Sequence, residues 1–128
     1  MSDNLSYSLQ TEQAVLGGLL LNNAVWAEVS EQFHFKDFYK LEYQILFQLF
    51  SKKIDQNKSV NALTLSEEAK NISALKEING EMYVFELFNK TYSVANIATY
   101  ITLVKEYSQK RKLEQLITLL DKVPYPVL

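Results

Sequence analysis

The stretch SVANIATYITLVKEYSQKRKLEQLITLLDKV, residues 93–123, contains neither glycine nor proline. Ser93 is a favourable N-cap residue, because a serine hydroxyl accepts a hydrogen bond from an amide of the first helical turn. Pro124 ends the run, since proline lacks the amide hydrogen and clashes with the preceding turn. We therefore expect one helix from Ser93 to Val123. At about 1.5 Å per residue it would be about 46 Å long, whereas a compact chain of this size is only about 36 Å across.

The apolar residues of this expected helix fall into two groups separated by a polar stretch. The first group recurs at helical spacing and consists of Val94, Ile97, Ala98, Tyr100, Ile101, Leu103, Val104 and Tyr107. Residues 108–112, SQKRK, include no apolar side chain. We expect the first half to pack on its own domain and the second half to project as an arm that needs a partner. The predicted self-association residues on that arm are Leu113, Leu116, Ile117, Leu120 and Val123.

The composition predicts a single all-helical domain. The 128 residues are 48% hydrophobic with only three glycines and two prolines, which favours long helices over many short strands. The absence of cysteine excludes disulfides and fits a reducing cytoplasm. His34 is the single histidine, so we expect an ordinary surface residue rather than a metal ligand. The net charge of −2 argues against a general binder of phosphate backbones, although it allows a local basic patch.

The longest apolar run, Ala14–Leu21, predicts neither a membrane span nor a signal peptide. It is too short to cross a bilayer. The acidic residues Asp3 and Glu12 precede it, and no basic segment does, which is unlike a secretory signal. We expect a cytoplasmic protein without membrane contact.

Four segments are expected along the chain: residues 1–8 as a flexible tail, 9–92 as a globular helical bundle, 93–123 as the long helix, and 124–128 as a second tail. In the bundle, apolar spacing predicts five helices: Leu9–Leu21, Ala24–Phe33, Leu41–Ile54, Ala62–Asn71 (capped by Asn61) and Gly80–Asn89. Residues 73–79 are expected to be irregular. The expected core consists of Leu9, Val15, Leu16, Leu19, Leu20, Val25, Trp26, Val29, Phe33, Phe38, Leu41, Ile45, Leu46, Leu49, Phe50, Tyr83, Val84, Leu87 and Phe88.

Two features of the bundle allow more than one interpretation. Gly17 and Gly18 lie inside a predicted helix, where each glycine costs about 1 kcal/mol relative to alanine. The pair favours close approach of another helix, and the alternative is a ligand near the backbone. Trp26 fits the core better than it fits an exposed stacking platform.

No catalytic, cofactor or metal site is predicted. The sequence has no G-x-x-x-x-G-K-[ST] phosphate loop, no H-E-x-x-H and no G-x-S-x-G. Glu67 and Glu68 are adjacent, so on a helix they point about 100° apart and do not form a catalytic carboxylate pair. An enzyme is therefore the least favoured interpretation.

One basic group stands out in the long helix. A solvated helix face is the favoured interpretation, and a nucleic-acid contact is the alternative. Such a contact would show a steep dependence of DNA binding on salt. The residues concerned are Lys105, Lys110, Arg111 and Lys112.

Taken in order, these segments resemble the N-terminal domain of DnaB-type replicative DNA helicases. The departures from the family pattern, Asn61, Asn79 and Tyr92 in place of Asp, Gly and Pro, concern caps and turns rather than the fold. The resemblance covers residues 9–123. It is carried by EQAVLGGLLL at 12–21 with Asn22 and Trp26, the D-F-Y corner at 37–39, Val60 with TLSEE at 64–68, G-x-x-Y-x-x-x-L at 80–87, SVANI at 93–97, Tyr100, Val104, Lys105 and KRKL at 110–113.

The resemblance implies a non-catalytic assembly and docking domain. In the family, a helical hairpin, of which residues 93–123 would be the first half, pairs two copies. Three such dimers then form the collar of a ring hexamer. The collar docks primase and, in some bacteria, a helicase loader. The family continues into a second hairpin helix, a linker and an ATPase domain, and ATP and magnesium are expected only there.

Three other functions stay open at this stage. The chain could be a stand-alone regulator, loader or decoy that inserts into another helicase's collar; whether the reading frame continues into a phosphate-loop domain would decide this. It could instead be a helical DNA-binding domain. A helicase-binding domain of a primase, which has a similar helical fold, is a less favoured option.

Overall fold

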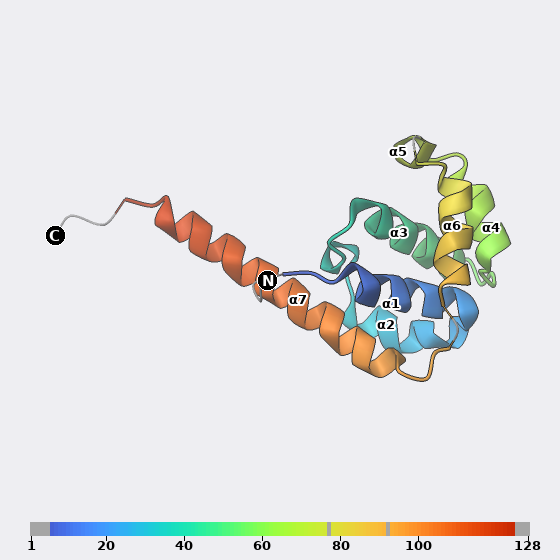
Figure 1. Cartoon of the computed structure of the whole chain (residues 1–128), viewed down its shortest axis with the longest axis horizontal. Helices are drawn as coiled ribbons and strands as arrows, with labels where there is room; N and C mark the ends of the chain where they lie inside the picture. The colour runs from blue at the N-terminus through green and yellow to red at the C-terminus, as the bar shows by residue number, and fades with distance from the viewer. Residues whose placement is uncertain (1–5, 77, 92, 125–128) are drawn as a thin grey trace.

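A computed structural model describes residues 6–76, 78–91 and 93–124, and this part of the chain is helical without strands (Figure 1). The predicted all-α class is confirmed. The elements, in chain order, are α1 (Leu9–Leu21), the 3-10 turn η1 (Asn23–Val25), α2 (Trp26–Gln32), the 3-10 turn η2 (Phe35–Asp37), α3 (Leu41–Asp55), α4 (Ala62–Ala69), α5 (Ser73–Lys76), α6 (Gly80–Asn89) and α7 (Ile97–Asp121).

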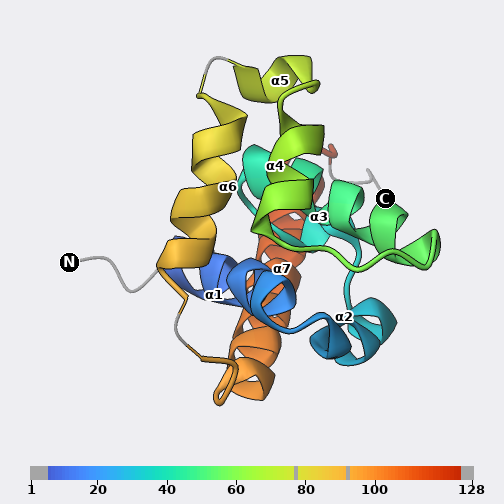
Figure 2. The same cartoon turned by 90° about the vertical axis from the view of Figure 1, so that its right-hand side faces the viewer.

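Helix α1 lies at the centre of the head, the name used here for residues 6–91. It packs against α3, α6 and α7, while α4 packs along α6. Figure 2 shows α4 beside α6, with α1 crossing α7. Val15 and Leu19 of α1 have no exposed surface, and neither does Val84 of α6. The buried apolar residues form one continuous core.

Side chains cap the N-termini of α1 and α4. The Ser8 hydroxyl accepts a hydrogen bond from the Thr11 amide at 3.3 Å, so α1 begins at the predicted residue. Asn61 and Thr64 cap each other: the Thr64 amide donates to Asn61 Oδ1 at 2.9 Å, and the Asn61 amide donates to Thr64 Oγ1 at 3.0 Å. The predicted N-cap at Asn61 is confirmed, and asparagine does there what aspartate does.

The structure differs from the prediction at the end of α4 and in residues 73–79. Helix α4 ends at Ala69 rather than Asn71, and a four-residue helix, α5, occupies part of the stretch expected to be irregular. Asn79 caps α6 with a φ of 52°. Asparagine tolerates this left-handed conformation better than most residues other than glycine, so the departure from glycine at this position leaves α6 starting at the predicted Gly80.

The buried face of α3 is rotated from the predicted one. Tyr43 and Phe47 are buried, although neither was expected in the core. Leu41 is 59% exposed, so its predicted burial was wrong. The chain leaves the corner at Phe38 in an extended conformation, and this sets the phase of the helix that follows. Leu9, at the start of α1, is also exposed.

Trp26 is half-buried and packs against the core, as predicted. Its ring lies 5.5 Å from the ring of Phe47 and 5.5 Å from that of Phe50, centroid to centroid. The tilted arrangement of both pairs is favourable for aromatic contacts. The helix predicted for residues 24–33 starts as the 3-10 turn η1 and becomes α-helical only at Trp26.

The Gly17–Gly18 pair confirms the prediction of a close approach, here to the junction between α6 and α7. A Cβ atom on Gly17 would lie 1.8 Å from Thr91 Oγ1, and one on Gly18 would lie 2.8 Å from Ile97 Cδ1. Thr91 follows α6, and Ile97 is the first residue of α7. The two glycines therefore let the start of the long helix sit against α1.

Helix α7 is shorter than predicted at both ends. It begins at Ile97, and Asn96, not Ser93, is its N-cap residue. The Ser93 hydroxyl accepts from the Ala95 amide at 3.0 Å, and the Ile97 amide donates to the Val94 carbonyl at 3.1 Å. These bonds close a turn that delays the helix. Its 25 residues are about 37 Å long. Tyr92 lies outside the described residues.

Candidate self-association arm and its polar anchor

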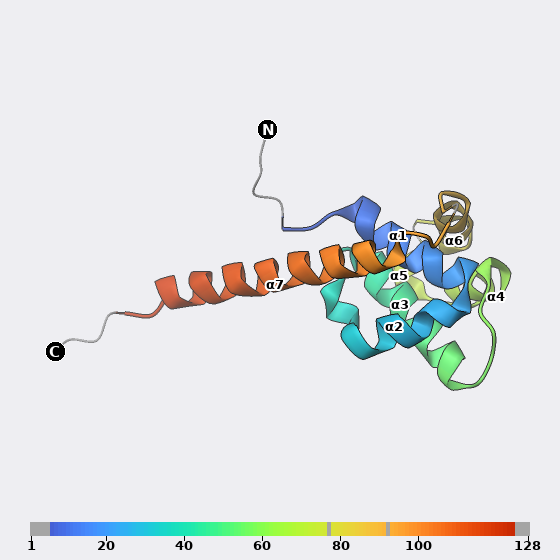
Figure 3. The same cartoon turned by 90° about the horizontal axis from the view of Figure 1, so that it is seen from below.

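The distal part of α7, residues 113–121, extends beyond the head and is called the arm here (Figures 1 and 3). Every side chain from Lys112 to Pro124 is exposed. Four of the five predicted self-association residues therefore lie on one exposed element, and Val123 follows just after its end. Leu119 is an exposed apolar residue that the spacing argument omitted. The exposed fractions lie between 50% and 61% for Leu113, Leu116, Ile117, Leu119, Leu120 and Val123.

The arm's apolar stripe is not a continuation of the buried face of α7. Ile97, Ile101, Val104 and Ser108 are the buried residues of the helix and lie on one side of it. At 3.6 residues per turn, Leu119 lies nearly in line with Ser108, whereas the apolar stripe is centred about 125° round the helix from that side. The stripe consists of Leu113, Leu116, Ile117, Leu120 and Val123. The head packs on the first face, so it cannot cover the second.

The polar stretch between the two apolar faces is an anchor to the head, not a solvated spacer. Ser108 has no exposed surface, and its hydroxyl donates to Asp37 Oδ1 at 2.6 Å. The Lys105 ammonium lies 3.2 Å from Asp37 Oδ2, and the Lys112 ammonium 3.5 Å from Asp37 Oδ1. We call Asp37, Lys105, Ser108, Arg111 and Lys112 the polar anchor.

The Asp37 carboxylate at the centre of this anchor is only 1% exposed. Burial opposes its ionisation, but the hydrogen bonds from Ser108, from the His34 amide and from Lys105 outweigh that effect and lower its pKa below the ordinary value of 3.8. The bond from the His34 amide is 2.8 Å long and fixes the turn η2. The carboxylate is therefore an ionised acceptor held by both its own turn and α7. The predicted position of His34 at the surface is confirmed.

Arg111 fastens α7 to two further parts of the chain. Its guanidinium donates to the Asp37 carbonyl at 2.7 Å and to the Ser6 carbonyl at 2.9 Å. It also lies over the Tyr39 ring, 5.7 Å from the centroid. The Tyr39 ring also stacks on Tyr7, with centroids 3.8 Å apart and planes 4° from parallel. Residues 6–8 thus contact α7 and the corner, and residues 1–5 of the expected tail lie outside the described residues.

Glu12 is a second buried carboxylate beside the same corner. Its two oxygens accept from the Tyr39 amide at 2.8 Å and from the Lys40 amide at 3.3 Å. Burial outweighs these hydrogen bonds and raises the pKa of Glu12 above 4.5. Glu12 therefore joins α1 to the corner that also carries Asp37.

We expect the stability of a Glu12→Gln variant to depend on pH differently from that of the parent. The raised folded pKa of Glu12 gives the parent a contribution that is complete below the unfolded pKa and is lost as pH rises through the folded pKa. Other titrating groups are common to both proteins. Urea unfolding between about pH 4 and pH 7 should therefore show the parent losing stability relative to the variant as pH increases. A constant difference would contradict this.

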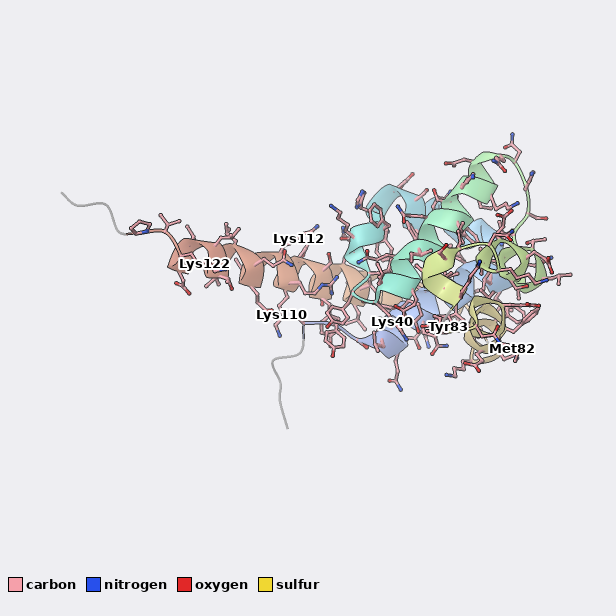
Figure 4. The ribbon with its side chains drawn as sticks, turned by 90° about the horizontal axis from the view of Figure 1, so that it is seen from above. Lys40, Met82, Tyr83, Lys110, Lys112 and Lys122 are labelled. Carbon is pink, nitrogen blue, oxygen red and sulfur yellow. The ribbon has the colours of Figure 1, made fainter. Side chains whose placement is uncertain are left out.

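The four basic residues considered for nucleic-acid contact are placed unequally. Lys105 and Arg111 are engaged with Asp37, Ser6 and Tyr39. Lys112 contacts Asp37 but is 63% exposed. Figure 4 shows Lys110 and Lys112 on α7 and Lys122 at its end. The basic group is thus largely part of the anchor, which the sequence did not predict.

Lys40 also contacts an aromatic pair in the head (Figure 4). Its ammonium lies 5.2 Å from the Tyr43 centroid and 5.0 Å from the Tyr83 centroid. Burial raises the pKa of Tyr83 to about 12 and also raises the pKa of Tyr43. Both phenol groups are therefore neutral at physiological pH. This contact has the geometry of a cation–π interaction.

Within the described ranges, His, Asp and Glu side chains do not gather in threes as a metal site needs. The helices of the same ranges include none that is long and apolar enough to cross a membrane.

The profile of the family described as "DnaB-like helicase N terminal domain" matches residues 4–106 of this sequence. The chain belongs to this family. A crystal structure of the N-terminal domain of DnaB helicase from Mycobacterium tuberculosis superposes on this DnaB-like domain with a TM-score of 0.84 and 27% sequence identity. The match covers 92% of this chain and 86% of that one.

Curated relatives of this DnaB-like domain are replicative DNA helicases. The DnaB of Buchnera aphidicola subsp. Baizongia pistaciae is 36% identical over 109 residues, which are 85% of this chain and 24% of the relative. The DnaB of Geobacillus stearothermophilus is 33% identical over 106 residues, 83% of this chain and 23% of the relative. The chain thus spans about a quarter of the relatives it matches. The resemblance inferred from the sequence is confirmed.

Proposed function

We propose that this domain is a non-catalytic assembly module of a replicative DNA helicase and that its arm is the surface through which copies associate. The observation that carries the proposal is the exposed apolar stripe formed by Leu113, Leu116, Ile117, Leu120 and Val123. Each apolar side chain contributes about 1.5–3 kcal/mol when it is fully buried. A contiguous stripe of this kind is typical of a protein–protein interface. The similarity to replicative helicases supports an assembly role in DNA replication.

The assembly we propose is the one that the family resemblance implies: pairing of two copies through the arm, and three pairs in a hexameric collar. We extend the proposal to docking of primase or a helicase loader on that collar, which rests on family membership alone. ATP, magnesium and DNA would then be contacted by other parts of such a helicase. The place of action would be the cytoplasm.

Self-association should weaken when charge is placed on the arm. We expect the parent chain to form dimers whose fraction rises with concentration, and a Leu116→Asp/Leu120→Asp variant to be mainly monomeric, because a carboxylate is costly to bury in an apolar contact. Sedimentation equilibrium over a range of concentrations measures this. Both positions are exposed in a single copy, so the variant should fold like the parent, as circular dichroism would check.

Leu63→Asp is the matched control, since Leu63 is 60% exposed but lies on α4 in the head. It should leave the dimer fraction unchanged. A parent chain that stays monomeric at high concentration would contradict the proposal, and so would equal loss of dimer in the control and the arm variant.

A further inference from the structure

The polar anchor is the last attachment between the head and α7 before the arm. Lys105, Ser108, Arg111 and Lys112 all lie within two turns of the helix, and all four donate to Asp37. Beyond Lys112 the side chains of α7 are exposed. The arm from residue 113 to residue 121 is about 14 Å long, so a small change at the anchor is magnified at its tip.

We propose that Asp37 is a positioning residue. Through the polar anchor it sets the direction of the arm and the side to which the apolar stripe faces. Apolar burial is non-directional, so the contacts of Ile97, Ile101 and Val104 allow α7 to rotate or tilt at modest cost. Hydrogen bonds to a fixed carboxylate have strict distance and angle requirements. The polar anchor therefore determines the orientation of α7 that the core contacts leave undetermined.

The part of the polar anchor that belongs to the head, Asp37 and its corner, is held in place by several hydrogen bonds. Asp37 is held by the His34 amide within the turn η2. The next residue, Phe38, is fully buried, and its carbonyl accepts from Gln44 Nε2 at 2.7 Å. Glu12 of α1 then accepts from the next two amides along the chain. Because the corner is tied to α1 and α3, the carboxylate has a fixed place in the head.

On α7, the polar anchor offers the Asp37 carboxylate two cationic groups that can replace each other, but only one donor with a fixed position. Lys105 and Lys112 bring flexible ammonium groups to the two oxygens, and such groups can follow a helix that moves. Ser108 cannot, because its short side chain is buried and its bond to Asp37 is 2.6 Å long. Asp37 and Ser108 thus determine the position of α7 most strictly.

Distance measurements between spin labels test this proposal directly. The sequence contains no cysteine, so a Gln48→Cys/Thr118→Cys pair reports the distance from the head to the arm, and a Gln10→Cys/Gln48→Cys pair reports distances within the head. All three positions are exposed. Leu116→Asp and Leu120→Asp are included in every protein, and labelled chains are diluted with unlabelled ones. The measurement then concerns single copies and does not depend on the proposed self-association.

We expect Asp37→Asn to broaden the head-to-arm distance distribution roughly twofold, because loss of charge-assisted bonds lets the contact open locally. The distribution within the head should stay as in the parent. Ser108→Ala should produce the same change to a smaller degree. Lys122→Met, which removes an exposed lysine just after the arm, is the matched control for Lys105→Met and should have no effect.

An Asp37→Asn protein with an unchanged head-to-arm distribution would overturn the proposal. If Asp37→Asn also broadens the distance distribution within the head, the variants Ser108→Ala and Lys105→Met decide. Parent-like head-to-arm distributions in both variants would overturn the proposal. Broadening of the head-to-arm distribution, with the distribution within the head unchanged, would support it.

Discussion

Replacing Asp37 with alanine is expected to lower the free energy of unfolding by about 3 kcal/mol, the largest effect expected from removing one polar side chain of this domain. The change removes the acceptor of the buried Ser108 hydroxyl and of the His34 amide. It also leaves Lys105 without its partner. Lys112 is largely exposed and can regain water, so its loss contributes little.

Urea unfolding measures this change, with Asp55→Ala as the matched control, because Asp55 is an exposed aspartate at the end of α3. The control should shift the midpoint only slightly. Asp37→Asn should fall between the two, since an amide oxygen can still accept one of the bonds. A loss for Asp37→Ala no larger than that of the control would show that the anchor does not stabilise the fold.

The same effect has a defined pH dependence. The folded pKa of Asp37 lies below its ordinary value of 3.8. A lowered folded pKa gives stability that is present above the unfolded pKa and is lost as pH falls through the folded one. The difference between the parent and Asp37→Asn should therefore be constant near neutrality and shrink below about pH 4.

The helices that the sequence predicts well are those whose boundaries are set by local chemistry. Ser8 and Asn61 cap α1 and α4 with their own side chains, and Gly80 starts α6 after a left-handed Asn79. Ser93 has the right residue type for a cap, yet its hydroxyl is used in a turn that begins four residues before α7. Packing of that turn on Gly18, and of the preceding Thr91 on Gly17, is tertiary information, which local propensity does not contain.

The apolar arm could be inferred from the sequence because helical spacing and helix length are local properties. The polar anchor could not, since it joins residues far apart in the chain: Asp37 and Ser108 are 71 positions apart. The D-F-Y corner was singled out by resemblance, but nothing in its spacing assigns Asp37 a partner. Basic residues at 105–112 looked like a solvated face because a buried acceptor for them was not identifiable.

Gly17→Ala is expected to destabilise the domain by about 2 kcal/mol, although alanine is the better helix former. A Cβ atom at this position would lie 1.8 Å from Thr91 Oγ1 and 2.8 Å from Thr91 Cβ. Rotating the Thr91 side chain relieves the first contact but not the second, because Cβ is fixed to the backbone. The junction between α6 and α7 must then move away from α1.

Gly18→Ala is the matched control, because it makes the same change one residue along the same helix. Its nearest neighbour is Ile97 Cδ1, at 2.8 Å, which is the end of a flexible side chain and can give way. The gain in helix propensity, about 1 kcal/mol, should then offset most of the cost, and the urea midpoint should stay near that of the parent.

Combining Gly17→Ala with Thr91→Ala separates this steric explanation from a general effect on α1. Removing Oγ1 and Cγ2 eliminates two of the three close contacts and leaves only the one to Thr91 Cβ, so part of the lost stability should return. Thr91→Ala alone should be mildly destabilising, since the Thr91 hydroxyl donates to the Leu87 carbonyl at 3.2 Å. Strictly additive effects would mean that the two sites do not interact, and the close approach of the long helix to α1 would then need another cause.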